Sequence, residues 1–529
     1  MKAAMIILAV LVAACSSSCA SDWTRDATGP EAPGERVLVA GLKERMQSLV
    51  DEGSVPSIAV GVARSGVILS EEATGFADRE RHVTANVHTP YPIASITKPL
   101  TATALMVLVE DGKIDLNGPI EDYLAAGTRL RSFAGSRSEA TVQRVASHTA
   151  GLPLHSNHYY ANEPEQPPEF EESVRRYGML VSPPGERFQY SNLGYGLIGH
   201  AIEQVAVKEE RYQAGSYPEF METEVFKPLG MSDAFLYAGG ELAAEAATKY
   251  ANGRSIPPCI SDTPGAADVY ASVHDLLLFG MFQLSHRRPD QEQLLSTAAI
   301  ERMQTPNPET GPTKLWEHEG SGCGLGWFIG ITADGTRVVY HSGGTLGVSS
   351  VIALVPAEEI VVVVLTNTGS NWPEMLLVGI LDSLGSANAE EFQTGQTPEP
   401  ADGHKTLFPL GDWYGTVRVP QGTVPFELHS QASGRIMVRM NDGSMKALQE
   451  ISYQPDLPMF LNSNERRFLR GWAEIAVDSN DVKRGQPYKV WIELTERAPG
   501  KLEGALICFS QRTLYTGPLS HWVEIRKAQ

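Results

Sequence analysis

The sequence predicts an α/β domain built around an antiparallel sheet and followed by a smaller, β-rich domain. Three observations predict this. Apolar runs on both sides of the turn at 64–66 have the pattern of a hairpin. Four further strand patterns between residues 324 and 366 follow one another on short connections, which join antiparallel strands. After a polar stretch at 386–405, residues 406–529 alternate short apolar runs with turn residues and show no helical period.

Length and charge limit the classes of function. The chain has 529 residues, of which 42% are hydrophobic, so it can bury a large core in two domains. Its formal net charge of −20 disfavours nucleic acid as a partner, because phosphate binding needs a clustered basic surface. His155 and His158 have a spacing that suits zinc, but nothing nearby completes a ligand set. We therefore expect neither a metal nor an organic cofactor.

Residues 1–20 have the pattern of a secretory leader, with one lysine, an apolar run and small residues near the end. The segment Val12-Ala-Ala-Cys15 resembles a bacterial lipoprotein cleavage box, in which Cys15 becomes the lipidated first residue. Ordinary cleavage after Ala20 is the alternative. Residues 21–36 are predicted to form a tether. The sequence thus predicts an exported protein, either anchored in the cell envelope through Cys15 or secreted.

The other cysteines are scattered without metal-type spacing. We expect isolated thiols, although an exported chain could pair two of them in a disulfide. They are Cys19, Cys259, Cys323 and Cys508. Nothing in the sequence indicates an oligomeric state.

The elements of the first domain are predicted in order. A helix at 37–50 precedes the hairpin strands 55–63 and 67–70, and a buried helix at 100–109 ends at Asp111-Gly112. Helical patterns return at 194–205 and 272–285. The later strands are predicted at 324–331, 337–340, 348–355 and 360–366.

The stretch just before the buried helix holds the strongest candidate for chemistry. Ser95 and Lys98 are three residues apart, so on a helix they lie about one turn from each other on the same face. A serine hydroxyl becomes a good nucleophile only when a nearby base takes its proton, and a buried lysine can be that base. Ser95 also lies at the positive end of the helix dipole.

Three later features are weaker candidates. Tyr190 and Asn192 lie on the approach to the helix at 194–205. His341 follows the strand at 337–340, and Gly343 and Gly344 would let a backbone approach a ligand closely. His148 is expected to pin a loop by hydrogen bonds, and 153–170 to form a loop on the rim of a cleft, with Tyr159 and Tyr160 available to substrate.

The motifs Ser95-x-x-Lys98, Tyr190-x-Asn192 and His341-x-Gly343 occur in one order. In this order the chain resembles the penicillin-recognising serine hydrolases, a family with class C β-lactamases, D-alanyl-D-alanine carboxypeptidases, D-aminopeptidases and esterases. Further matches are 147–152, 184–195 and 324–327, and the resemblance covers about residues 37–385. It implies an antiparallel sheet with helices on both sides and a mainly helical lobe that bears Tyr190.

The resemblance also implies roles. Ser95 would be acylated, and Lys98 and Tyr190 would share general-base and general-acid duties. Asn192 would hold the substrate amide, while His341 lines the opposite wall. The backbone N–H groups of Ser95 and Gly344 would form the oxyanion hole, beside Gly343. Many relatives have a lysine in place of His341, and a neutral histidine would bind a substrate carboxylate less strongly.

The expected function is therefore that of a serine hydrolase that forms an acyl-enzyme with an amide or ester, with D-amino-acid or cell-wall-type peptides favoured as substrates. An esterase or a weak β-lactamase is the alternative among enzymes. A catalytically silent cell-wall-binding protein is the alternative from another class. Residues 411–416 resemble lipocalin-like barrels, and no catalytic set is visible after 405. We therefore expect a chain that ends near Ser386 to keep covalent reactivity at Ser95.

Overall fold

The structure is a computed structural model. It describes residues 33–212, 214–236, 244–286, 293–310, 320–332, 334–386, 408–454, 468–475, 477, 488–510 and 517–528. Cys15, Cys19 and most of the predicted tether and linker lie outside the described residues.

The first domain is organised around an eight-stranded antiparallel sheet with the order β13-β14-β15-β16-β17-β1-β2-β3. Its strands are β1 (Ser57–Arg64), β2 (Val67–Asp78), β3 (Val83–Thr84), β13 (Gly322–Cys323), β14 (Phe328–Ile331), β15 (Arg337–Thr345), β16 (Val348–Val355) and β17 (Ile360–Thr366). The predicted hairpin and the four later strands are all present. The prediction for the second of these four was too short, because β15 continues to Thr345 and therefore contains His341, Gly343 and Gly344.

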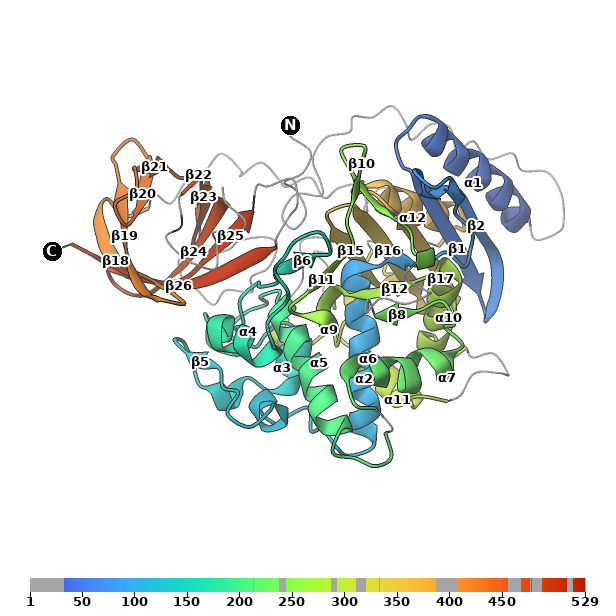
Figure 1. Ribbon diagram of the computed structural model, residues 1–529, viewed down its shortest axis with the longest axis horizontal. Helices are drawn as coiled ribbons and strands as arrows, with labels where there is room; N and C mark the ends of the chain where they lie inside the picture. Colours follow the sequence, from blue (N-terminus) through green and yellow to red (C-terminus); the bar gives the residue numbers. More distant parts are fainter. Residues whose placement is uncertain are drawn as a thin grey trace.

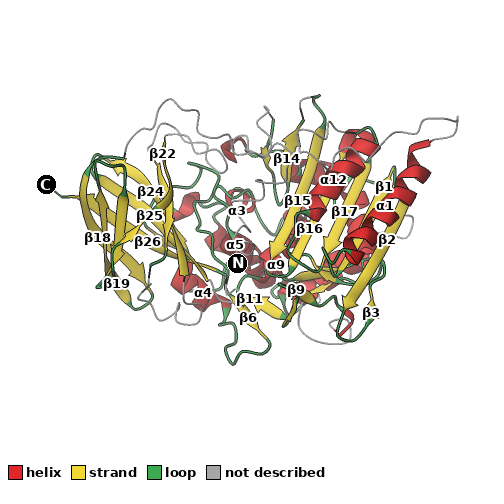
Figure 2. Ribbon diagram, turned by 90° about the horizontal axis from the view of Figure 1, so that it is seen from above, coloured by secondary structure: helices red, strands yellow, loops and turns green. Residues whose placement is uncertain are grey.

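Helices cover both faces of this sheet (Figure 2). On one face lie α1 (Pro33–Asp51) and α12 (Trp372–Ser383), which pack on β2 and on β16 and β17. On the other face lies α10 (Val273–Gln283), which packs on β1 and β17. Every residue of β17 is buried, which explains its run of four valines: a strand covered on both faces has no polar side.

A mainly helical lobe lies beside the sheet, with α2 (Thr97–Glu110) at its centre (Figure 1). Its other helices are α3 (Val142–Ala146), α4 (Phe170–Tyr177), α5 (Asn192–Ala206), α6 (Tyr217–Met221), α7 (Lys227–Leu229), α9 (Pro264–Ala267) and α11 (Thr297–Met303). Short helical turns are η1 (Ala94–Ile96), η2 (Ile120–Tyr123), η3 (Arg137–Glu139), η4 (Glu222–Phe226), η5 (Pro308–Thr310) and η6 (Pro356–Glu358). Short strands are β4 (Tyr91–Pro92), β5 (Arg131–Ser132), β6 (His158–Tyr160), β7 (Met179–Leu180), β8 (Phe235–Leu236), β9 (Lys249–Ala251), β10 (Arg254–Ile256), β11 (Cys259–Ser261) and β12 (Val269–Ala271).

The C-terminal domain is one nine-stranded antiparallel sheet with the order β21-β20-β19-β18-β26-β25-β24-β23-β22. Its edge strands, β21 and β22, are separated in sequence by Leu448 alone, so the sheet must curl until its two edges nearly meet. Its strands are β18 (Gly411–Val419), β19 (Gly422–Ser430), β20 (Ile436–Met440), β21 (Lys446–Ala447), β22 (Gln449–Gln454), β23 (Phe468–Ala473), β24 (Tyr488–Ala498), β25 (Lys501–Ser510) and β26 (Pro518–Lys527). The predicted β-rich domain is therefore a nearly closed sheet.

This second sheet lies against the helical lobe (Figure 1), where β26 contacts α4. Backbone bonds tie it to the predicted rim loop: the Ser156 N–H donates to the Pro518 carbonyl at 3.1 Å. Gly517 is needed there, because a Cβ on it would stand 2.0 Å from the Ser156 carbonyl oxygen. Among the described residues, no helix is long and apolar enough to cross a membrane.

Candidate active site

Ser95 lies in η1, directly between strand β4 and helix α2. The chain turns sharply there, since Ala94 has a left-handed φ of 47°, which is uncommon for a residue with a side chain. Such strain persists only where neighbours fix the backbone. Here the Ile93 N–H donates to the Val269 carbonyl, and the Val269 N–H donates to Thr97 Oγ1, both at 3.1 Å. Ser95 is thereby held half-buried at the start of α2.

Lys98 is completely buried, and its ammonium position is fixed by three acceptors. Its Nζ lies 3.1 Å from Ser95 Oγ, 2.9 Å from Asn192 Oδ1 and 2.9 Å from the Ala266 carbonyl oxygen. None of these groups carries a negative charge. Burial therefore lowers the pKa of Lys98 well below its ordinary value. The neutral amine can accept the Ser95 proton.

Tyr190 lies beside the Ser95 hydroxyl and is hydrogen-bonded to it. Its ring centroid is 4.8 Å from Lys98 Nζ. Burial raises the pKa of the Tyr190 phenol above its ordinary value, although the bond with Ser95 opposes that effect. The phenol is therefore protonated at neutral pH and can donate a proton rather than take one.

His148 positions this tyrosine. Its ring lies 4.4 Å from the Tyr190 ring, and its Nδ1 accepts a hydrogen bond from the Ser191 N–H at 3.1 Å. Burial lowers the pKa of His148 far below its ordinary value, so the ring is neutral. This agrees with the loop-pinning role that the sequence predicts for it.

Asn192 is the first residue of α5, which begins two residues earlier than predicted. Ser191 caps the helix, because its Oγ accepts a bond from the Gly194 N–H at 3.0 Å. The cap fixes the backbone beside both Tyr190 and Asn192. Both motif residues thus reach Lys98 and Ser95 from one rigid helix start.

Strand β15 brings His341 and the glycine pair to the same place. A Cβ on Gly343 would stand 2.1 Å from the Ile93 carbonyl oxygen, so only glycine lets β15 pass so close to η1. Ser350 Oγ donates to that same Ile93 carbonyl at 3.0 Å. The two segments that bear Ser95 and His341 are thereby locked together.

His341 is buried, and its Nδ1 lies 2.7 Å from the Ser342 carbonyl oxygen, to which it donates. Burial lowers the pKa of His341 to about 3. The ring is neutral at physiological pH, and its Nε2 carries a lone pair. It can accept a hydrogen bond from a substrate but offers a carboxylate no charge.

One backbone edge of β15 is open beside this site. Pairing with β14 runs only from Arg337 to Tyr340, whereas pairing with β16 continues to Thr345. In the described part of the chain, residues 341–345 therefore have one edge without a strand partner. An extended ligand can bind along such an edge by main-chain hydrogen bonds.

Two groups that contribute to the site were not predicted from the sequence. The Ala266 carbonyl accepts from Lys98, and the Phe328 ring packs 5.0 Å from the His341 ring. Gly265 was the one residue that could have indicated this arrangement. A Cβ on Gly265 would stand 2.4 Å from the Tyr195 carbonyl oxygen, so the glycine allows α9 to pack closely against α5. A glycine inside Pro264-Gly-Ala-Ala267 does not by itself indicate such an approach.

The C-terminal sheet also borders Tyr190. Tyr190 packs against an apolar cluster drawn from both domains: Leu154, Met179, Val181, Ala505, Ile507 and Trp522. The segment just before Tyr190 is bonded to β24, since Arg497 Nη1 lies 2.6 Å from Glu186 Oε2 and Arg187 Nη1 donates to Thr495 Oγ1 at 3.1 Å. Arg497 and Glu186 are only 11% and 18% exposed. No pattern in the sequence indicates this contact.

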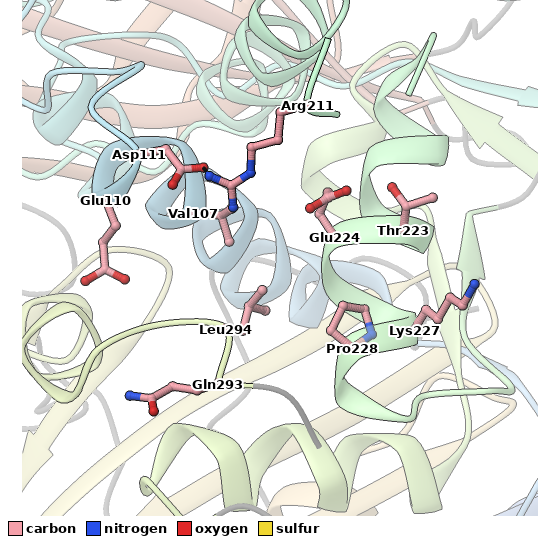
Figure 3. A pocket seen from close by; sticks show the side chains of 10 residues that line it. All are labelled: Val107, Glu110, Asp111, Arg211, Thr223, Glu224, Lys227, Pro228, Gln293 and Leu294. Carbon is pink, nitrogen blue, oxygen red and sulfur yellow. Dashed lines mark ion pairs between the residues drawn. The ribbon is translucent and has the colours of Figure 1, made fainter. Parts of the chain in front are cut away.

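Two other features lie apart from the Ser95 site. His155 Nε2 is bonded to Asp262 at 2.8 Å, and no group of described residues could hold a metal ion. A cavity of about 480 Å³ lies at the far end of α2, where Arg211 pairs with Asp111 beside Glu224 and Lys227 (Figure 3). Helix α2 has 14 residues, so roughly 20 Å separates that cavity from Ser95.

Comparison with known proteins agrees with this geometry. The sequence model of the family described as Beta-lactamase matches residues 42–378. Protein flp of Staphylococcus aureus (strain MRSA252) is 25% identical over 336 residues, which are 62% of this chain and 62% of that protein, so the chain spans less than two thirds of that relative.

Two solved structures resemble the fold over both domains. The octameric penicillin-binding protein homologue from Pyrococcus abyssi superposes with a TM-score of 0.54 at 22% identity, and the match covers 92% of this chain and 99% of that one. SurE with D-Leu superposes with a TM-score of 0.56 at 20% identity, and the match covers 93% and 100%.

Proposed function

The chain belongs to the Beta-lactamase family, a family of serine hydrolases, and from that premise we propose that it cleaves peptides that contain D-amino acids through an acyl-enzyme on Ser95. The observation that carries the proposal is the contact of Ser95 Oγ with both Lys98 and Tyr190. A silent binding protein, the competing function from another class, has no use for this arrangement.

The first step uses Lys98 as the base. Its lowered pKa leaves a neutral amine 3.1 Å from Ser95 Oγ, within reach of the proton that must leave during attack. Ser95 Oγ then bonds to the substrate carbonyl carbon. The resulting positive charge on Lys98 is stabilised by Asn192 Oδ1 and the Ala266 carbonyl.

The second step uses Tyr190 as the proton donor to the leaving group. Its raised pKa keeps the phenol protonated, and its bond to Ser95 places it beside the bond that breaks. Once the leaving group departs with the Tyr190 proton, the proton held by Lys98 passes to the Tyr190 oxygen, whose ring lies beside Lys98 Nζ. Water then attacks the ester with the same groups acting in reverse order.

The N–H groups of Ser95 and Gly344 are assigned as the donors that bind the oxyanion formed when Ser95 attacks the substrate carbonyl. Ser95 lies just before α2, at the positive end of the helix dipole, which favours a developing negative charge. Gly344 pairs with β16 but lies in the segment of β15 whose other edge has no strand partner among the described residues, beside Gly343, which allows the close approach. Backbone donors aimed at a developing charge usually supply the largest part of transition-state stabilisation.

Peptide substrates are favoured by the open edge of β15, because an extended main chain can bind there as an added strand. The D-configuration is supported by the fold neighbour SurE, whose structure contains D-Leu. The neutral His341 argues against strong recognition of a β-lactam carboxylate. An esterase or a weak β-lactamase remains the second candidate.

Initial rates on three substrates separate these possibilities: a D-amino-acid dipeptide amide, a short-chain p-nitrophenyl ester and a chromogenic β-lactam. Ser95→Ala is the control in each assay. We expect kcat/KM to be highest for the D-peptide and to fall at least tenfold for its L-epimer. A higher kcat/KM for the ester or the β-lactam would select the second candidate, and stoichiometric binding without turnover would select the silent binder.

His341→Lys should change substrate preference rather than the chemical step. An ammonium there can form a charge-assisted hydrogen bond with a substrate carboxylate, so KM for such substrates should fall roughly tenfold. The same peptide with an amidated C-terminus is the matched control, and its KM should not fall. In the wild-type enzyme, a neutral His341 predicts no pH dependence from this residue between pH 5 and 8.

We also propose that Cys15 anchors the protein to the cell envelope on the exported side. The basis is the Val12-Ala-Ala-Cys15 pattern, which lies outside the described residues. Cys15→Ser should move the protein from the membrane fraction to the soluble fraction while kcat/KM stays constant. An unchanged distribution on fractionation would contradict lipidation.

A further inference from the structure

Lys249 and Cys259 form an unusual contact outside the Ser95 site. Lys249 begins β9 and Cys259 begins β11, and Lys249 Nζ lies 2.8 Å from Cys259 Sγ. Lys249 is only 4% exposed, and its Nζ lies 5.7 Å from the centroid of the Tyr160 ring. Cys259 is half-buried, so a small oxidant can reach its sulfur.

The separation is short for a hydrogen bond to sulfur. It falls within the 2.7–3.2 Å range typical of N–H···O bonds, although sulfur is the larger atom and normally stands farther from its donor. The same separation is too long for a direct bond between sulfur and nitrogen. A single oxygen bonded to both atoms would hold them at about this separation.

The surroundings also favour a link that carries no charge. In the described part of the chain, no carboxylate forms an ion pair with Lys249. The acidic group that feels its charge is Asp268, which is itself buried and accepts bonds from Ser261. A neutral link at this buried position needs no counter-ion.

We propose that Lys249 and Cys259 are joined by an oxygen into an Nζ–O–Sγ crosslink, with molecular oxygen as the oxidant. One thiol, one amine and one dioxygen give one crosslink and one water. The S–O and O–N bonds form, while the O–O bond, the S–H bond and one N–H bond break. The two hydrogens leave with the second oxygen atom as water. Sulfur and nitrogen are oxidised, and dioxygen is fully reduced.

The crosslink would stiffen one rim of the candidate active site. Cys259 pairs with Tyr160 across β11 and β6, which lies in the predicted rim loop. The Lys249 backbone packs on the turn after β15, where a Cβ on Gly347 would stand 2.9 Å from Lys249 Cβ. A covalent link therefore joins the rim loop to the end of the strand that carries His341. We expect it to change KM for peptide substrates more than kcat.

Peptide mass spectrometry of the full-length protein tests the proposal without any assay of activity. Protein kept in air is compared with protein reduced by a phosphine before tryptic digestion. In the oxidised sample we expect no cleavage after Lys249, and a joined species heavier than its two parent peptides by about 14 Da, one oxygen less two hydrogens. Reduction should restore cleavage after Lys249 and a free Cys259 thiol.

Two variants and one control complete the test. Cys259→Ser and Lys249→Arg should each abolish the joined species, whereas Cys323→Ser, which removes a different buried thiol, should leave it unchanged. The proposal is overturned if wild-type protein in oxygenated buffer keeps a free thiol and full cleavage after Lys249. It is overturned equally by a joined species that is lighter than its two parent peptides by two hydrogens, since that mass indicates a direct S–N bond. A disulfide from Cys259 to another cysteine would also overturn it.

Discussion

Ser95→Ala will abolish covalent labelling by a fluorophosphonate or a β-lactam and will remove turnover, because no other hydroxyl in the site is bonded to both Lys98 and Tyr190 among the described residues. Intact-mass spectrometry of the labelled wild-type protein should place one adduct on Ser95. Turnover by Ser95→Ala in a preparation free of other hydrolases would show that the nucleophile is misassigned.

The two partners of Ser95 should have large but non-additive effects. Lys98→Ala and Tyr190→Phe should each slow acylation by about 10² to 10⁴, the range for loss of a positioned proton transfer. The double variant should lose far less than the product of the two, since both residues act on one proton path. Stopped-flow acylation rates measure all three, and full additivity would mean that the residues act independently.

The same pair sets the expected pH profile. Protonation of Lys98 removes the base, so acylation should rise as pH increases through the lowered pKa of Lys98 and then stay level. Because the pKa of Tyr190 is raised, its phenol stays protonated through the neutral and mildly alkaline range. The acylation rate should therefore not decline in that range. Single-turnover rates between pH 5 and 9 test this.

Local patterns predicted the parts of the site that lie on one element. Ser95 and Lys98 are a single helical turn apart, and the apolar run after them could only be a buried helix. The helix α5 was also predicted, although its start was placed two residues too late and Ser191 was not identified as its cap. The sequence alone could not show that Lys98 reaches the Ala266 carbonyl, 168 residues away, because long-range contacts leave no local period.

The error at β15 has a physical cause as well. Ser342, Gly343 and Gly344 have the composition of a turn, so the strand was expected to end before His341. The strand continues because its pairing with β16 runs to Thr345, and residue 343 is a glycine because η1 leaves no room there for a Cβ. Glycine within this strand indicates that another backbone segment packs closely against it. The requirement for this tertiary contact outweighs the low strand propensity of glycine.

Contacts of the C-terminal sheet change the expectation for a shortened chain. The sequence shows no catalytic set after 405, which favoured retained reactivity in a chain that ends near Ser386. The structure instead places the second sheet against the segment before Tyr190, through Arg497 and Glu186 at 2.6 Å. Loss of that sheet would also expose Leu154, Met179 and Val181 to water.

We therefore expect a chain that ends at Ser386 to lose acylation of Ser95 by about 10²-fold or more, because a displacement of Tyr190 by about 1 Å has an effect of that size. Acylation by a fluorophosphonate, followed by gel fluorescence and checked by circular dichroism, measures this. Acylation near the wild-type rate in the folded, shortened chain would restore the first expectation.

Arg497→Gln in the full-length protein tests the same contact without removing a domain. It removes the guanidinium from a largely buried ion pair with Glu186, which costs more than loss of an exposed pair, so acylation should slow roughly tenfold. Glu186→Gln combined with Arg497→Gln should recover part of that loss, since both charges of the pair are then removed together. Arg439→Gln is the matched control: Arg439 pairs with Glu427 at 2.7 Å within the same sheet but is 39% exposed, and its loss should leave acylation unchanged. Equal effects of Arg497→Gln and Arg439→Gln would show that the interface does not position Tyr190.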